Sequence, residues 1–299
     1  MRSRKKIRQS WDDRLLYLII NTLLVIILIA VLYPIIYVVS CSLSSGDAVQ
    51  SGQVLLWPVD FSLDGYKLVF SYASVWKGLK NSIIYTVGGT ALNMVLTVLA
   101  AYPLSRPKFQ GRKLYMAIFL FTMIFSAGII PKYILMSKLH LTNTRWSVIF
   151  TGGISVYNMI IVRTYFRSSI PGELYEAAYI DGASEFRCFW TIALRLSKSV
   201  LSVITLYYAV AHWNSYFTAM LYVRDPEKQP LQMVLRNILV ASKLDLTQIT
   251  DPEYLAKAVG MTEVLKFALI VITSVPVILL YPLVQKYFQK GVMIGSVKG

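Results

Sequence analysis

The polar side chains in the middle of the long apolar stretches of this sequence are neutral, which limits the chemistry they can perform, and the charged Glu263 and Lys266 lie at the edge of the last stretch. The neutral side chains are Asn21, Asn93, Asn158, His212 and Asn214. Ion-coupled carriers usually place carboxylates within their membrane spans, and no Asp or Glu lies in the middle of any of these stretches. Neutral amide and imidazole groups form hydrogen bonds, most commonly between neighbouring helices.

Catalytic and metal-binding arrangements are absent from the sequence. His140 and His212 are far apart, and no Cys or acidic cluster accompanies either of them. No Ser, His and Asp set is recognisable, and no GxxxxGK[ST] loop that could cradle phosphates is present. We therefore expect neither an enzyme nor a chain that itself binds ATP, a cofactor or a metal.

The elements that must position these polar groups are apolar helices. The 299 residues are 56% hydrophobic and 15% charged, with a mean hydropathy of +0.56, whereas soluble domains are about 45–50% apolar and about 25% charged. A bilayer core is crossed by about 20 mostly apolar residues, and six stretches fit. We predict an all-α integral membrane protein with six transmembrane helices. The stretches are 15–40, 81–104, 114–130, 146–161, 200–223 and 263–284.

Basic residues are distributed unevenly among the connecting segments. The N-terminal tail, the second and fourth connections and the C-terminal tail carry 18 Lys and Arg against 6 Asp and Glu, while the opposite set carries 11 against 8. Basic residues concentrate on the cytoplasmic side of membranes, so both termini are predicted to be cytoplasmic. Membrane topology thus accounts for the net charge of +15 without a nucleic-acid partner.

This topology divides the chain into a membrane core, loops and two tails. The segments are a cytoplasmic basic tail (1–14), the first transmembrane helix (15–40), an extracellular loop (41–80), a core of five helices (81–284) and a cytoplasmic C-terminal tail (285–299). The core contains a cytoplasmic loop at about 167–199 and an extracellular loop at 223–262.

The 167–199 loop has the sequence of two short helices separated by a turn. Pro171 suits the first turn of a helix, and Glu173 suits its positively charged N-terminal end. Gly182 can adopt the left-handed conformation that ends this helix, and Ser184 is a favourable N-cap for the next one. The loop is therefore predicted to be a rigid helical knob.

The two predicted helices differ in their side-chain patterns. In the first, Leu174, Ala177 and Ala178 share a face on which small residues let another surface approach. In the second, apolar side chains recur at helical spacing and are expected to anchor the helix against the bundle. These are Phe186, Phe189, Trp190, Ala193 and Leu194. The knob is either an ordinary interfacial hairpin or a docking site for a cytoplasmic partner.

Part of this loop resembles a motif of a known family. The run is Glu176-Ala177-Ala178-x-x-Asp181-Gly182-Ala183-Ser184, followed by Phe189 and Ile192-x-Leu194, and it is similar to the EAA loop of ABC importer permeases. The segment 281–298 resembles the end of carbohydrate-uptake permeases of the maltose-transporter (MalG) type. The most similar branch is the LplC/YtcP type, and the resemblance covers nearly the whole chain.

The resemblance implies a type I (MetI-like) permease in a bacterial cell membrane, with cytoplasmic EAA coupling helices. Such a chain forms the path for a carbohydrate, either an oligosaccharide or one derived from a polysaccharide, together with a second permease. Two copies of a separate ATPase bind the ATP, and an extracellular solute-binding lipoprotein delivers the sugar. The implied coupling residues are Glu176, Ala177, Ala178, Asp181, Gly182, Ala183 and Ser184.

The fifth apolar stretch offers a candidate path for such a sugar. Aromatic faces and neutral hydrogen-bonding groups suit sugar rings. Tyr208, His212 and Tyr216 follow one another at i, i+4 and i+8 on one helix face, and Asn214 is a further candidate in the same stretch. Tyrosines also gather at membrane interfaces, which is the alternative role. An ABC permease for another solute and a secondary transporter remain alternative functions.

One departure from the family pattern concerns the end of the loop. Arg195 stands where the family usually has proline, and Ser199 stands where it often has another. Without these prolines the second loop helix either ends after Leu194 or continues through Arg195 and Lys198. Arg195 and Lys198 could then reach lipid phosphates or the ATPase.

Overall fold

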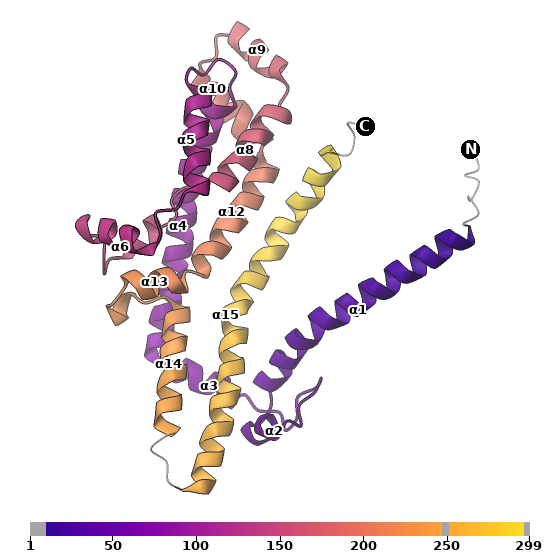
Figure 1. The fold of residues 1–299 in the computed structure, drawn as a ribbon, viewed down its shortest axis with the longest axis vertical. Helices are drawn as coiled ribbons and strands as arrows, with labels where there is room; N and C mark the ends of the chain where they lie inside the picture. Colours follow the sequence, from indigo (N-terminus) through magenta and orange to yellow (C-terminus); the bar gives the residue numbers. More distant parts are fainter. Residues whose placement is uncertain (1–9, 247–250, 296–299) are drawn as a thin grey trace. The chain divides into compact units, whose positions relative to one another are not determined.

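The computed structural model describes residues 10–246 and 251–295, and every regular element within these ranges is a helix (Figure 1). The all-α class is therefore confirmed for the described residues. The chain forms two compact units. Unit 1 comprises Met1–Ser71 with Leu239–Ile272, and unit 2 comprises Tyr72–Ile238 with Thr273–Gly299.

Unit 1 begins with the apolar helix α1 (Trp11–Ser42). The Ser10 amide donates a hydrogen bond to the Asp13 carboxylate at the start of this helix (3.2 Å), and most of the side chains of α1 are exposed, as a lipid-facing helix requires. The short helices α2 (Gly46–Gln50) and α3 (Asp64–Ser71) follow. Gly46 and Gly260 pack backbone to backbone, since a Cβ on Gly46 would lie 2.8 Å from the Gly260 carbonyl carbon.

Unit 2 contains most of the remaining helices, and two further helices have residues in both units. Those of unit 2 are α4 (Ala73–Ser105), α5 (Arg112–Ile124), α6 (Ile129–Lys138), α7 (Arg145–Phe150), α8 (Val156–Ser168), α9 (Gly172–Ile180), α10 (Glu185–Cys188), the π-helix η1 (Phe189–Ala193), α11 (Leu194–Leu196), α12 (Lys198–Trp213), α13 (Tyr216–Tyr222) and the 3-10 helix η2 (Pro226–Lys228). The two shared helices are α14 (Leu231–Leu246) and α15 (Pro252–Gly295).

The core of unit 2 forms where α4 packs along α8 and α12. Ala101, Met159, Val162 and Ile204 have no accessible surface there. The last residues of α4 lie at the end of the unit that carries α9 and α10 (Figure 1). A long helix with one face buried on two neighbours thus fixes the position of the short helices at its end.

The predicted spans are only partly continuous helices. Three helical segments among the described residues are long and apolar enough to cross a membrane: Trp11–Ser42, Ala73–Ser105 and Lys257–Leu280. Two helix pairs also qualify but are sharply bent, α5 with α6 by 114° and Glu185–Leu196 with α12 by 80°. The structure therefore has between three and five candidate spans in its described ranges.

Glycines explain two of the interruptions. Gly128 separates α5 from α6 with a φ of +76°, and Gly152 follows α7 with a φ of +75°, a conformation that ends a helix. As a result, the predicted fourth span at 146–161 is divided between α7 and α8, and α8 has only 13 residues. Helices also extend beyond the predicted spans, because α4 begins within the 41–80 segment and α15 within the 223–262 segment.

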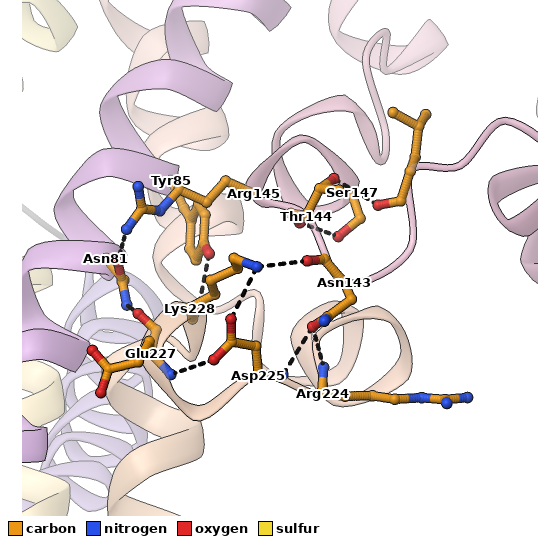
Figure 2. Close-up of polar contacts among 11 residues, drawn as sticks. Asn81, Tyr85, Asn143, Thr144, Arg145, Ser147, Arg224, Asp225, Glu227 and Lys228 are labelled. Carbon is orange, nitrogen blue, oxygen red and sulfur yellow. Dashed lines mark hydrogen bonds and ion pairs between the residues drawn. The ribbon is translucent and has the colours of Figure 1, made fainter.

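A polar cluster near the N-terminal part of α4 joins three connections, those between α6 and α7, between α13 and η2, and between η2 and α14 (Figure 2). The Asn81 amide donates to the backbone oxygens of Glu227 (2.9 Å) and Gln229 (3.1 Å). The Tyr85 hydroxyl donates to the Lys228 oxygen (2.6 Å). These buried or half-buried groups are satisfied by loop backbone, so the cluster fixes η2 against α4.

Asn143 accepts several of the hydrogen bonds that hold this cluster together. Its backbone has a φ of +58°, a conformation that Asn tolerates better than most residues. Its side-chain oxygen accepts hydrogen bonds from the amides of Arg224 (3.1 Å) and Asp225 (2.8 Å), as Figure 2 shows. Asn143 therefore contributes both a left-handed backbone conformation and a side-chain oxygen that accepts two hydrogen bonds.

Replacement of Asn143 separates these two contributions. We expect Asn143→Gly to lose only the acceptor, at about 0.5–1.5 kcal/mol per hydrogen bond, and Asn143→Ala to lose about 1 kcal/mol more because of the positive φ. Asn143→Asp, which keeps both properties, is the matched control. Thermal unfolding would rank the stabilities of the three variants. Faster hydrogen exchange at the Arg224 and Asp225 amides would show that the lost stability comes from these hydrogen bonds. Equal stability of the Ala and Gly variants would contradict the backbone argument.

Candidate functional site

Residues 171–196 form the helical hairpin that the sequence predicts. Helix α9 ends at Ile180, and Gly182 follows in the left-handed conformation (φ +77°). Ser184 N-caps α10, its side-chain oxygen accepting from the Arg187 amide (3.3 Å). The expected positions of the turn and of the second N-cap are therefore confirmed. We call this segment the loop hairpin.

One side of α9 is buried in the loop hairpin, and the opposite side is exposed. Tyr175 is the buried residue of α9, while Ala178 and Tyr179 pack partly against the core. Leu174 is 44% exposed and Ile180 is 87% exposed. Leu174 and Ile180 are therefore accessible to another surface.

The second helix is anchored by fewer side chains than the apolar spacing predicts. Phe189 and Ala193 are buried, as expected, but Phe186 is 70% exposed and Trp190 54% exposed. The reason is the π-helix η1, in which i and i+5 align. Cys188 and Ala193, five apart, both have no accessible surface.

Of the two alternatives for the end of this helix, the structure shows that it does not continue through Lys198. Helix α11 ends at Leu196, and Ser197 caps it with non-helical backbone angles (φ −106°, ψ 15°) before α12 begins. The helices on the two sides of Ser197 are bent by 80°. The absence of proline at Arg195 and Ser199 therefore does not produce one long helix.

A single arginine at the end of α4 holds the loop hairpin. The Arg106 guanidinium lies 3.6 Å from the centre of the Tyr175 ring, a cation–π contact. One of its terminal nitrogens donates to the Tyr179 hydroxyl (2.9 Å). The Glu185 carboxylate in turn accepts from the hydroxyls of Tyr179 (2.6 Å) and Tyr102 (2.8 Å). These five residues connect α4, α9 and α10 in one network.

Electrostatics within the network favour the charged forms of its two ionisable ends. Partial burial acts to raise the pKa of Glu185, but hydrogen bonds from Tyr179 and Tyr102 and the charges of Arg106 and Lys108 outweigh it and lower that pKa. Burial likewise opposes the charge of Arg106, and the tyrosine hydroxyls outweigh it, so its pKa is raised. The ion pair between these groups is long (3.9 Å), so the tyrosines mediate most of the interaction.

A polar cavity of about 230 Å³ lies inside unit 2, between α4, the α7–α8 connection and α12. Its lining residues include Asn93, Asn158, Tyr208, His212 and Ser215, and none of the twelve is Asp, Glu, Lys or Arg. Three buried lining atoms have no hydrogen-bond partner among the described residues: Asn93 Oδ1, His212 Nε2 and Ser215 Oγ. Such unsatisfied groups are costly to bury, so the cavity is suited to a polar guest.

The residues expected to line a sugar path do not share one face. Tyr208 and His212 are buried and line the cavity. Helix α12 ends at Trp213, however, so Asn214 and Tyr216 lie elsewhere. The Asn214 oxygen accepts from the Gln232 amide (2.9 Å), and the Tyr216 hydroxyl contacts the Met220 sulfur (3.2 Å).

Two of the cavity residues also have structural contacts. The Tyr208 hydroxyl shares a hydrogen bond with the Thr97 hydroxyl (2.6 Å) and accepts one from the Ser155 amide (3.1 Å). The His212 ring lies against α4 where Gly89 leaves room, since a Cβ on Gly89 would fall 2.3 Å from the ring. A glycine is needed at position 89 for this close approach.

Comparison with known proteins identifies the family. A model of the binding-protein-dependent transport system inner membrane component family matches residues 93–294. Protein LplC of Bacillus subtilis (strain 168) is 41% identical over 266 residues, 89% of each chain. The chain belongs to this permease family. A further relative, the polygalacturonan/rhamnogalacturonan transport system permease protein YtcP of the same organism, is 40% identical over 289 residues, 94% of the permease and 97% of YtcP.

Solved structures confirm the type I permease fold. In the crystal structure of a bacterial ABC transporter involved in the import of the acidic polysaccharide alginate, one chain is 38% identical, with a TM-score of 0.83 over 95% of the permease and 100% of that chain. A chain from an alginate ABC transporter in complex with an alginate pentasaccharide-bound periplasmic protein has a TM-score of 0.55 at 14% identity over 92% and 95% of the two chains. The latter supports the fold alone. The permease is thus a membrane transport subunit of an ABC importer, not an enzyme.

Sequence reasoning missed the residues that hold the loop hairpin. Tyr102 and Arg106 are four apart on and after α4, and Tyr175 and Tyr179 are four apart on α9. This spacing of four predicts that each pair lies on one helix face. It does not predict that the two pairs contact each other. Of the expected coupling residues, Glu176, Ala177, Asp181 and Gly182 are exposed on the hairpin and Ala183 is half-buried. Their role in coupling stays a prediction.

The cavity gives a test of the Gly89 contact. Gly89→Ala would force the His212 ring out of its position, because the added methyl would overlap the ring atoms. We expect a loss of about 1–3 kcal/mol in unfolding free energy and recovery in Gly89→Ala with His212→Ala. Gly88→Ala, whose methyl would meet only the Ile149 side chain at 3.4 Å, is the matched control. Equal stability of both single variants would contradict the contact.

The pH dependence of the loop hairpin follows from Glu185. Its pKa in the folded chain lies below the usual value of 4.5, so its stabilising contribution is present above pH 4.5 and is lost as the pH falls through the folded pKa. We expect hydrogen exchange in α9 to accelerate below about pH 4.5. In the Glu185→Gln variant, this acceleration of hydrogen exchange at low pH should be absent. An unchanged acceleration in the variant would assign the transition to another carboxylate.

Proposed function

We propose that this permease carries an oligosaccharide derived from a polysaccharide across a bacterial cell membrane. It forms the translocation path with a second permease subunit, and two copies of a separate ATPase bind ATP and drive transport. An extracellular solute-binding lipoprotein delivers the sugar, and lipid surrounds the spans. Nucleic acid has no part in this function.

The observation that carries this proposal is the construction of the loop hairpin. Its inner side is fixed to α4 by Arg106, while its outer side presents Leu174, Ile180 and the carboxylate of Glu176 without cover. A rigid element with a bare outer side is suited to transmit the movement of a docked partner. The ATPase is that partner in the proposal, because the chain has no phosphate loop of its own.

The proposed topology places the loop hairpin and both termini in the cytoplasm. The supporting observation is the excess of Lys and Arg, 18 against 6 acidic residues, on the segments of that side. The polar cluster around Asn143 then lies on the extracellular side, where the binding protein docks.

The sugar class rests on the cavity and on the names of the relatives. The cavity offers amide, hydroxyl, imidazole and aromatic groups, and its lining contains no Asp, Glu, Lys or Arg, which suits sugar hydroxyls. YtcP is named for polygalacturonan and rhamnogalacturonan transport, and one structural relative belongs to an importer of alginate. Tyr208 and His212 are the residues that we expect to contact the sugar.

Gly182 provides the sharpest test of coupling. Its φ of +77° strains a β-branched residue, although open space surrounds the position. Gly182→Val should therefore tilt α10 against α9 and reduce sugar uptake about ten-fold or more, since about 1–2 kcal/mol of strain is introduced, while membrane insertion persists. Gly182→Asn tolerates the same backbone conformation and is the matched control. Uptake by the complex in a deletion strain and ATP hydrolysis by the purified complex are the measurements.

Normal substrate-stimulated uptake by a well-inserted Gly182→Val variant would exclude this role of the hairpin. The ATP-driven mechanism has its own test. An ATPase should copurify with the permease, and uptake should stop when the phosphate-loop lysine of that ATPase is replaced. Uptake that survives this replacement would indicate a secondary transporter, and uptake of amino acids or peptides in place of sugar would indicate another solute.

A further inference from the structure

A short apolar segment follows α1 and α2 in unit 1. We call residues 54–61, with the sequence VLLWPVDF, the apolar loop. Trp57 is 80% exposed and Phe61 is 68% exposed, and the side chains of Leu55 and Leu56 are exposed as well. Four large apolar side chains so close together indicate a surface that contacts something other than water.

The backbone of the apolar loop is fixed to the end of α1. The Ser40 hydroxyl donates a hydrogen bond to the Leu56 oxygen (2.6 Å). The Val59 amide donates to the Ser44 hydroxyl (3.1 Å), and the Val59 oxygen accepts from the Ser45 amide (3.2 Å). These bonds hold the exposed side chains of the loop in place beside the last turn of α1.

The inner side of the apolar loop is packed. Val54 is buried in a small core of unit 1 together with Cys41 and Val49, and the half-buried Val59 packs against this core. The loop therefore has one side inside the fold and one side outside it. The exposure of its other apolar side chains belongs to a folded surface and does not result from a lack of packing.

The position of α1 in a bilayer sets the depth of the apolar loop. The uncharged stretch of this helix begins after Arg14, and the hydrocarbon core takes about 20 residues of helix. Counted from Arg14, the core ends near Ile35, so the last turn of α1 lies at the level of the headgroups. Tyr33 and Tyr37, whose ring centres lie 6.2 Å apart, are of the residue type that is enriched at this level.

We propose that the apolar loop inserts its exposed side chains into the bilayer at the headgroup level and anchors the end of α1 there. Helix α1 is a candidate membrane span whose apolar side chains are exposed, and the loop continues this exposed apolar surface. Tryptophan is the residue most typical of the boundary between headgroups and hydrocarbon. On the proposed topology this boundary belongs to the outer leaflet.

A bilayer suits this surface better than a protein that binds and leaves. A solute-binding protein that departs after delivery would leave the four apolar side chains in water, whereas lipid covers them at all times. Helix α1 also needs a contact of this kind. Its buried residues are Ser40, Cys41 and Ser42, so packing within the described chain holds this helix at one end.

Spin labels on the apolar loop test its position. Cys41 and Cys188 are buried, so a label on purified full-length Leu55→Cys or Phe61→Cys reports the introduced residue. Each variant is placed in nanodiscs of phosphatidylcholine and phosphatidylglycerol, and relaxation by oxygen, which dissolves in lipid, is compared with relaxation by a water-soluble nickel chelate. We expect an oxygen-to-nickel ratio several-fold above that of Ser51→Cys. This matched control is exposed in the same connection but outside the apolar loop.

Two replacements of Trp57 test the anchor itself in the labelled Phe61→Cys chain. Trp57→Asp should lower the ratio to that of Ser51→Cys, because a carboxylate stays in water. Trp57→Phe should keep the high ratio, because an aromatic ring remains at this position. Both replacements change an exposed side chain, so the fold is retained.

Three results would overturn the proposal. The first is nickel relaxation of the loop labels as strong as that of the Ser51→Cys label, which would place the loop in water. The second is an equal ratio in Trp57→Asp and Trp57→Phe. The third is a loss of both oxygen and nickel relaxation when the second permease subunit or the binding protein is added, since a protein would then cover the loop.

This experiment is independent of the proposed transport function. Label accessibility is measured on the permease alone, without ATP, sugar or partner subunits. A permease whose loop labels contact lipid but which imports no sugar would contradict the proposed function and leave the anchor intact. Loop labels that lie in water in a permease that imports sugar would overturn the anchor and leave the proposed function intact.

Discussion

The contact between Arg106 and the tyrosines of α9 is the interaction on which the loop hairpin depends for its position in unit 2. The guanidinium is stacked on Tyr175 at 3.6 Å from the ring centre and is hydrogen-bonded to Tyr179. A stacked and hydrogen-bonded guanidinium fixes orientation in a way that a flexible ammonium cannot. Because Glu185 accepts a hydrogen bond from the hydroxyl of Tyr179, the same arginine also helps to position the first turn of α10. One side chain thus sets the position of both hairpin helices relative to α4.

Some polar side chains of unit 2 both stabilise the packing of the helices and line the cavity. The Tyr208 hydroxyl is satisfied by Thr97 and by the Ser155 backbone, so its position is fixed by the bundle. His212 is fixed differently, by its close fit against Gly89, and its Nε2 is left without a partner among the described residues. In a low-dielectric interior such an orphaned group costs free energy. A guest that accepts or donates a hydrogen bond there recovers this cost, which is why the cavity is better suited to a polar solute than to lipid.

Local signals in the sequence predict local structure well here and tertiary structure poorly. Gly182 and Ser184 place the turn and the second N-cap correctly, because capping depends on residues within one turn. The π-helix and the bend at Ser197 carry no such local signal, since packing of Cys188 and Ala193 against the core selects them. Helical spacing also grouped Tyr208 with Tyr216 on the assumption of one unbroken helix. The pairing of Arg106 with α9 joins residues about seventy positions apart, which no spacing rule reveals.

The route from the loop hairpin to the cavity is short and continuously packed. Beyond α10, the π-helix η1 buries Phe189 among α4 and α8 side chains. After the bend of 80° at Ser197, α12 carries Tyr208 and His212 to the cavity. Close-packed interiors transmit displacement with little compression, so a tilt of the hairpin about Gly182 has to be taken up along this path. Ser197, whose backbone is already non-helical, is the position where it can be taken up at the lowest cost.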